Sequence, residues 1–274
     1  MAETARRAEK IIRERAPHCA PQFGIILGSG LSLLAEQITD KIVFPYQDLP
    51  GFPVRLIEGQ QAQLTLGRIN QVPVVCLQGR AHFYEGCDPY QILTYVRTLK
   101  LLGCHTVIIT GAVGSLRAEI QPGQLILLRD HINFQGKNPL VGENDETFGP
   151  RFPDMSEAYD RQWRQQLGKV GHDLSMPLME GIYISVLGPM FETPAEIRVF
   201  RELGADVVGM SVVPEVIVAR HCGLRVIGLA VVTNLAAGLT TAPQSHEETL
   251  LTARNSSLQM IRLLNAFMGS KEIV

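Results

Sequence analysis

A short segment at residues 80–86 gathers side chains that can bind and position an anion. It follows an apolar run that ends at Leu77 and has the sequence Arg80-Ala81-His82-Phe83-Tyr84-Glu85-Gly86. A guanidinium offers a bidentate pair of donors to a phosphate, and the imidazole and phenol add donors at other distances. A solvated surface loop can have the same composition, so the segment alone indicates anion binding without establishing it.

Two segments of small residues provide places where the backbone can approach a ligand closely. Residues 28–30, with the sequence Gly-Ser-Gly, follow the first apolar run and precede a helical pattern. Their N–H groups can face an oxyanion, and a tight strand-to-helix turn is the alternative. Residues 110–115, Thr-Gly-Ala-Val-Gly-Ser, are predicted to form a second such loop. Because Leu33 stands where the dinucleotide fingerprint requires glycine, an NAD-dependent oxidoreductase is not favoured.

A further segment, residues 188–192, places an aromatic ring beside a carboxylate. Phe191 can stack on a planar ligand while Glu192 accepts from its N–H groups, although Glu192 could simply complement the dipole of the following helix. Polar residues also end the apolar runs at residues 208–211 and 232–234. Since ligands collect at the carboxyl ends of strands in open α/β sheets, these segments together predict one ligand site.

Other chemistries lack their sequence patterns. The seven histidines show no metal-ligand spacing, and no G-x-S-x-G or H-E-x-x-H pattern occurs, so no metal is expected. The five cysteines are scattered without a C-x-x-C pair, which argues against a disulfide framework and favours a reducing cytoplasm. His221 and Cys222 are predicted to pack in the core, and His131 is predicted to be a hydrogen-bonded structural residue.

Charge and hydropathy exclude two classes of partner. Lys and Arg number 25 against 27 Asp and Glu, a net charge of −2, so no basic field attracts nucleic acid. The most apolar stretch, residues 207–232, is interrupted by Pro214 and by charged residues, whereas a membrane span needs about 20 apolar residues. Residues 1–17 are predicted to form an amphipathic surface helix rather than a signal peptide, which makes a cytoplasmic location the expectation.

The elements that must position these groups alternate between strands and helices, which favours an α/β layered fold. Strands are predicted at residues 23–27, 64–66, 74–77, 106–110, 124–128, 182–187 and 226–233, and helices at 88–101, 156–171, 194–203, 213–222 and 246–268. Thr193 and Ser245 each open a capping box and mark two of the helix starts. Residues 134–154 form the one long loop, and without an internal linker residues 1–274 are interpreted as a single domain.

The motifs taken together resemble the trimeric, low-molecular-mass purine nucleoside phosphorylases of bacterial type. The resemblance runs from about residue 23 to residue 267 and rests on the segments at 27–31, 79–86, 151–153, 188–193, 208–215, 219–222, 233–234 and 245–248, in the family's order. It implies a single-domain three-layer sandwich in which helices flank a central mixed β-sheet. It also implies a homotrimeric pentosyltransferase of purine salvage that uses inorganic phosphate as a co-substrate and no cofactor.

The resemblance implies a role for each matching residue. The phosphate would lie among Ser29, Arg80, His82, Ala112 and Ser211. The nucleoside would be bound by Tyr84, Phe191, Glu192, Val208, Met210, Asn234 and His246, with Phe152 reaching into the neighbouring subunit's site. His82, Glu192 and Asn234 would be the catalytic residues.

The chemistry of phosphorolysis agrees with these roles. An anionic nucleophile must be held against the anomeric carbon, which Arg80 and His82 can do by positioning and electrostatics. The negative charge that grows on the leaving purine can be relieved if Asn234 donates its amide N–H to N7. Glu192 can accept from N1–H of a 6-oxopurine. Adenine instead presents a lone pair at N1, and bringing this acceptor against the Glu192 carboxylate in a buried site costs several kcal/mol. Inosine, guanosine and their deoxy forms are therefore the expected substrates, and adenosine is excluded.

Some positions depart from the family pattern and leave alternatives open. Gln60 stands where many relatives have histidine, and Gly111 and Val113 replace the more usual Asn and Ala. A xanthosine-preferring phosphorylase remains the main alternative. A methylthioadenosine phosphorylase would be favoured by aspartate at position 234, where Asn234 stands. A nucleoside-binding receptor would normally be exported and have two lobes, and the sequence predicts neither.

Overall fold

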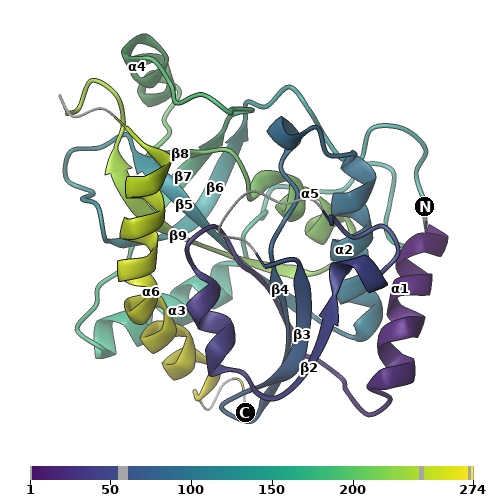
Figure 1. The fold of residues 1–274 in the computed structure, drawn as a ribbon. Coiled ribbons are helices and arrows are strands. Elements are labelled where there is room, and N and C mark those ends of the chain that lie inside the picture. Colours follow the sequence, from purple (N-terminus) through teal and green to yellow (C-terminus); the bar gives the residue numbers. More distant parts are fainter. Residues whose placement is uncertain (1, 55–60, 241–243, 271–272, 274) are drawn as a thin grey trace.

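A nine-stranded mixed sheet forms the centre of the computed structural model, which describes residues 2–54, 61–240, 244–270 and 273 (Figure 1). The strand order is β2-β3-β4-β1-β5-β8-β7-β6-β9, and β5 pairs with β9 as well. This second pairing closes β5, β8, β7, β6 and β9 into a ring. The strands are β1 (Phe23–Ile26), β2 (Thr39–Pro45), β3 (Gln63–Ile69), β4 (Val72–Gln78), β5 (Thr106–Ser115), β6 (Leu125–Asn133), β7 (Met179–Ser185), β8 (Val207–Gly209) and β9 (Arg225–Leu235).

Helices cover both faces of the sheet, and Figure 1 shows α1 and α2 on one side and α3 and α6 on the other. They are α1 (Ala2–Arg15), α2 (Pro89–Leu102), α3 (Arg161–Asp173), α4 (Pro194–Glu202), α5 (Val213–His221) and α6 (His246–Met268), with short 3₁₀ helices η1 (Ser32–Gln37), η2 (Tyr46–Asp48) and η3 (Phe83–Glu85). Strand β1 faces two cores, because Ile26 packs with α1, α2 and α5 while Phe23 and Ile25 pack with α3 and α6. A strand buried on both faces has a continuous apolar sequence, as predicted for parallel strands.

The predicted single-domain α/β fold with a mixed sheet flanked by helices is confirmed. The helix start at Thr193 is confirmed as well: Thr193 Oγ1 accepts from the Glu196 N–H, and the Glu196 carboxylate accepts from the Thr193 N–H at 2.7 Å. Ser245 is the N-cap of α6, since its hydroxyl accepts from the Glu248 N–H at 3.1 Å, which is one of the two hydrogen bonds of the predicted capping box. Helix α3 begins five residues later than predicted, because Asp160 is its N-cap and accepts from the Trp163 N–H.

Three local predictions differ from the structure. The expected loop at residues 110–115 is wrong, because β5 continues through it and pairs in parallel with β9. The helical pattern after Gly30 forms only the 3₁₀ helix η1. Strands β2 and β8 were not predicted, since β2 is a mostly exposed edge strand without a clear apolar alternation and β8 has three residues.

The structural interpretations of two histidines are confirmed. His131 Nδ1 lies 3.1 Å from the Tyr159 hydroxyl, and His221 Nε2 lies 3.0 Å from Asn144 Oδ1. His221 and Cys222 are both buried. Across the described residues, no group of three or more His, Cys, Asp or Glu side chains could hold a metal ion. None of the described helices is both long and apolar enough to span a membrane.

Substitution of Gly30 tests the packing of the segment after β1 against α6. Gly30 has φ +78°, and an added Cβ would lie 2.7 Å from the Ala253 Cβ. Gly30→Ala should therefore lower the free energy of unfolding by about 2–4 kcal/mol, because left-handed backbone strain and overpacking add. Gly86→Ala is the matched control, since Gly86 has φ +74° with nothing within 4 Å, and should cost only about 1–2 kcal/mol. Equal shifts of the urea midpoint in the two variants would contradict this packing.

Candidate active site

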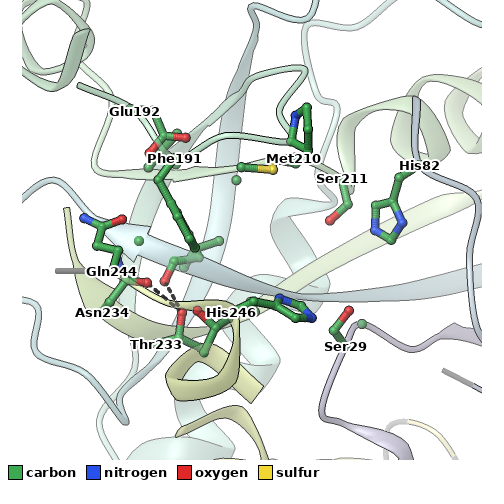
Figure 2. Close-up of a pocket in the computed structure, with 18 of the residues that line it drawn as sticks. Ser29, His82, Phe191, Glu192, Met210, Ser211, Thr233, Asn234, Gln244 and His246 are labelled. Atoms are coloured by element: carbon green, nitrogen blue, oxygen red, sulfur yellow. Dashed lines mark hydrogen bonds between the residues drawn. The ribbon is translucent and has the colours of Figure 1, made fainter. Parts of the chain in front are cut away.

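The carboxyl ends of six strands meet around a cavity of about 290 Å³ (Figure 2). Segments after β1, β4, β7 and β8, the ends of β5 and β9, and the start of α6 supply its walls. The lining residues are Gly28, Ser29, His82, Tyr84, Ala112, Val113, Gly114, Pro189, Phe191, Glu192, Val208, Gly209, Met210, Ser211, Thr233, Asn234, Gln244, His246 and Thr249. The predicted convergence of these segments on one site is thus observed.

Small polar groups gather at one end of the cavity, where Figure 2 shows Ser29, His82 and Ser211. His82 is buried, and its Nδ1 lies 3.0 Å from the Glu85 carboxylate, which also accepts from the His82 N–H at 2.8 Å. The His82 ring stacks on Tyr84 with centroids 4.8 Å apart. These contacts hold the imidazole in one orientation and leave Nε2 as the ring atom that can contact a ligand.

The start of α5 adds positive potential to this end. Ser211 lies just before the helix, and Val212, its N-cap, has φ +67°. A β-branched residue in the left-handed region is strained, and such strain clusters at ligand sites. The Ser211 N–H donates to the Tyr183 hydroxyl at 3.2 Å, while burial raises the pKa of Tyr183 to about 12. A helix N-terminus beside serine hydroxyls and an imidazole suits an anion.

Arg80 does not line the cavity, although the sequence places it among the phosphate ligands. Its guanidinium is fully buried and donates to the carbonyls of Ile26, at 3.1 Å, and Thr110. Arg80 Nε lies 3.6 Å from the buried Glu215 carboxylate, which also accepts from the Tyr95 hydroxyl. A buried charge needs a counter-charge and acceptors, and these groups hold Arg80 beneath the ends of β1 and β5.

The first glycine loop also differs from expectation. The Gly28 N–H is not free for an oxyanion, because it donates to Thr110 Oγ1 at 2.9 Å. An added Cβ at Gly28 would lie 2.9 Å from the Gly111 Cα, so glycine lets the two backbones approach. Ser29 is therefore the residue of this loop that offers the cavity a polar side chain.

The opposite end of the cavity combines apolar surface with a carboxylate and two amides. Phe191, Val208 and Met210 form its apolar wall. Burial raises the pKa of the Glu192 carboxyl. Asn234 is held by two contacts: its Oδ1 accepts from the Thr233 hydroxyl at 3.0 Å, and its Nδ2 donates to the Leu235 carbonyl at 3.2 Å. Flat apolar surface beside such donors and acceptors suits a heteroaromatic ring.

Glycines make room for these side chains. A Cβ at Gly114 would lie 3.2 Å from Asn234 Nδ2, and a Cβ at Gly188 would lie 2.3 Å from Met210 Sδ. Gly188 also has φ +70° and precedes a cis peptide bond to Pro189. The segment carrying Phe191 and Glu192 can therefore pass close over Met210.

Two further residues from the sequence analysis are not part of this cavity's description. Phe152, which the resemblance assigns to the neighbouring subunit's site, is 87% exposed and does not line this cavity, and Gln60 lies outside the described residues. Conversely, Gln244 and Thr249 line the cavity but lie in none of the segments that the sequence analysis assigned to the site. Thr249 follows His246 by three residues on α6, a spacing that places both on one helix face and could have revealed it.

Comparisons with known proteins agree with this geometry. The phosphorylase superfamily profile matches residues 22–268. Purine nucleoside phosphorylase 1 of Bacillus subtilis is 43% identical over 272 residues, covering 99% of this chain and 100% of that protein. Its counterpart from Geobacillus stearothermophilus is 44% identical, covering 96% and 95%. A Schistosoma mansoni purine nucleoside phosphorylase solved with adenosine is 36% identical with a TM-score of 0.93, covering 98% and 97%. The chain therefore belongs to the phosphorylase superfamily and, within it, to the purine nucleoside phosphorylases of bacterial type.

Proposed function

We propose that this phosphorylase prefers 6-oxopurine nucleosides, namely inosine, guanosine and their deoxy forms, and releases the free base and (deoxy)ribose 1-phosphate for purine salvage. One observation carries the proposal. A single cavity has an anion-binding end at His82 and Ser211 and a ring-binding end at Glu192 and Asn234. Phosphorolysis needs both groups bound at once, with the ribose between them.

At the first end, Ser29, His82, Ser211 and the Ala112 backbone hold inorganic phosphate against the anomeric carbon. Arg80 contributes positive charge from beneath the strand ends, and Glu215 limits that contribution. The attack is promoted by orientation and electrostatics, with no covalent enzyme intermediate and no cofactor. The bond from the anomeric carbon to the purine nitrogen breaks as the bond to the phosphate oxygen forms.

The ribose lies between the two ends, against Tyr84, Met210 and His246. Burial raises the pKa of Tyr84 to about 12, so its hydroxyl stays a proton donor at neutral pH. His246 opens α6, and Figure 2 shows its imidazole in the cavity beside Ser29. These groups orient the sugar so that its anomeric carbon faces the phosphate.

At the second end, Phe191 and Val208 sandwich the purine while Glu192 and Asn234 contact its edge. The Glu192 carboxylate accepts from N1–H, and the Asn234 amide donates to N7 as negative charge grows on the leaving base. This amide already has a rotamer fixed by Thr233 and Leu235, which lowers the entropic cost of the contact.

The active form is a homotrimer in the cytoplasm, with residues 1–274 acting as one domain. Residues 134–160 contain no helix or strand and carry three exposed apolar side chains: Phe134, Val141 and Phe152. Large apolar side chains exposed on one loop mark an interaction surface. Phe152 completes the ribose pocket of the neighbouring subunit.

Phosphate dependence tests the anion-binding end. Base release from inosine should require inorganic phosphate and yield ribose 1-phosphate. Ser211→Ala should raise the KM for phosphate by roughly 10- to 100-fold, because one hydrogen bond to a charged group is lost, while the KM for inosine stays within threefold. Equal release in phosphate-free buffer, with free ribose as product, would identify a hydrolase and contradict the proposal.

Base selection tests the ring-binding end. Glu192→Gln should lower kcat/KM for guanosine about 100-fold or more, since about 3 kcal/mol of stabilisation is lost when the acceptor for N1–H and the 2-amino group is replaced. Asn234→Asp should lower turnover of inosine and guanosine while improving adenosine relative to both.

The pH profile provides an independent measure of the same group. The ionised Glu192 carboxylate accepts from N1–H much more strongly than the protonated acid does, so kcat/KM for inosine should fall as pH drops through the pKa of Glu192, which burial raises above its ordinary value. The pH profile of Glu192→Gln should lack this fall at low pH and otherwise have the shape of the wild-type profile. If Glu192→Gln and Asn234→Asp both kept the wild-type selectivity among nucleosides, the purine would bind elsewhere.

Assembly tests the role of Phe152. Sedimentation should give three times the 30.2 kDa chain mass, and Phe152→Ala should raise the KM for inosine at least tenfold without dissociating the trimer. Val141→Ala, on the same loop and 75% exposed, is the control and should leave the KM unchanged. A fully active monomer would refute this arrangement.

A further inference from the structure

The side chain of Gln244 lies at the ring-binding end of the cavity and has no place in the mechanism described above. It precedes Ser245, the N-cap of α6, so the start of a well-defined helix fixes its backbone. Its Nε2 donates to the Leu235 carbonyl at 3.2 Å. The same carbonyl accepts from Asn234 Nδ2, so one backbone oxygen holds both amides at the same end of the cavity.

The carbonyl oxygen of the Gln244 amide differs from its nitrogen in its contacts. Its Oε1 is buried and has no hydrogen-bond partner within the described part of the chain. A buried acceptor without a donor is destabilising, because it has lost its hydrogen bonds to water, and such groups in native structures call for an explanation. In a ligand cavity, a donor on the ligand supplies that explanation.

The position of Gln244 indicates which donor this is, provided that the proposed function places the purine correctly. Figure 2 shows the Gln244 amide between the Glu192 carboxylate and the Asn234 amide. If Glu192 faces N1 and Asn234 faces N7, the purine atom between them is C6 with its substituent. The Gln244 carbonyl oxygen then faces a 6-amino group as an acceptor or a 6-oxo group as a repelling neighbour.

We propose that Gln244 recognises the 6-position of the base and accepts a hydrogen bond from a 6-amino group, so that adenosine is a slow but genuine substrate of this chain. The contact offsets part of the penalty that Glu192 imposes at the bare N1 of adenine, and 6-oxopurines remain preferred. For a 6-oxopurine, the amide turns over and donates Nε2 to O6, at the expense of its bond to Leu235. Removing the amide therefore changes inosine turnover little.

The test compares adenosine with purine riboside, which shares the bare N1 but has hydrogen at position 6, and with inosine, which has a 6-oxo group and N1–H. Gln244→Leu should lower kcat/KM for adenosine roughly tenfold, the value of one buried hydrogen bond, and change inosine and purine riboside less than threefold. Gln121→Leu is the matched control, because Gln121 is exposed and does not line this cavity, and should change none of the three. Equal urea midpoints establish that the variants are folded.

The outcomes separate this inference from the function on which it rests. If wild type cleaves inosine but not adenosine, or if Gln244→Leu lowers adenosine and purine riboside equally, Gln244 does not recognise the 6-position and the inference fails alone. If wild type does not cleave inosine in the presence of phosphate, the proposed function fails and the inference with it. A loss confined to adenosine supports both.

Discussion

The site depends on the close approach of β5 to its neighbours, which glycine makes possible. Strand β5 pairs with β1, β8 and β9, and its carboxyl end forms the floor of the cavity. A Cβ added at Gly28 would lie 2.9 Å from the Gly111 Cα, and one added at Gly111 would lie 3.0 Å from the Val212 side chain. A Cβ added at Gly114 would lie 3.2 Å from Asn234 Nδ2. Larger side chains at these positions would separate the anion-binding end from the ring-binding end. Two glycines weaken a strand's intrinsic preference, and the long pairing with β9 offsets that cost.

A buried ion pair between Arg80 and Glu215 lies beneath the cavity. Arg80 donates to the carbonyl ends of β1 and β5, so the strands that supply Ser29 and Ala112 are tied together by one guanidinium. Its partner Glu215 lies in the first turn of α5, the helix whose N-terminus faces the same end. A buried pair of this kind contributes more to geometry than to net stability, because desolvation consumes much of its attraction.

The two ends of the cavity differ in their side chains, as the proposed binding of phosphate at one end and of a purine at the other requires. The anion-binding end uses hydroxyls, an imidazole and a helix N-terminus, which are short and rigid and carry little apolar surface. The ring-binding end uses Phe191, Val208 and Met210 for contact area, and places its few polar atoms at the edge of the cavity. The Asn234 and Gln244 amides there are held by hydrogen bonds to Thr233 and to the Leu235 carbonyl, so under the proposed function these two groups are positioned before the base binds.

The amino-acid sequence by itself determined the alternation of strands and helices, the starts of α4 and α6, and most of the residues that meet in the cavity. These features rest on local rules: continuous apolar runs for buried strands, side-chain caps for helix ends, and the collection of polar residues after strands. The order of motifs then identified the family.

Only the tertiary structure decided the features that depend on partners distant in sequence. Residues 110–115 form a strand rather than a loop because β9, about 120 residues away, supplies their hydrogen bonds. Arg80 lies beneath the cavity because Glu215 is buried there, and neither position is visible in the pattern around residue 80. Gln244 enters the site because Leu235, nine residues earlier, accepts from its amide. The intrinsic helix and strand propensities of residues reflect only their neighbours in the sequence. These contacts, in contrast, exist only once the sheet has closed and brought distant segments together.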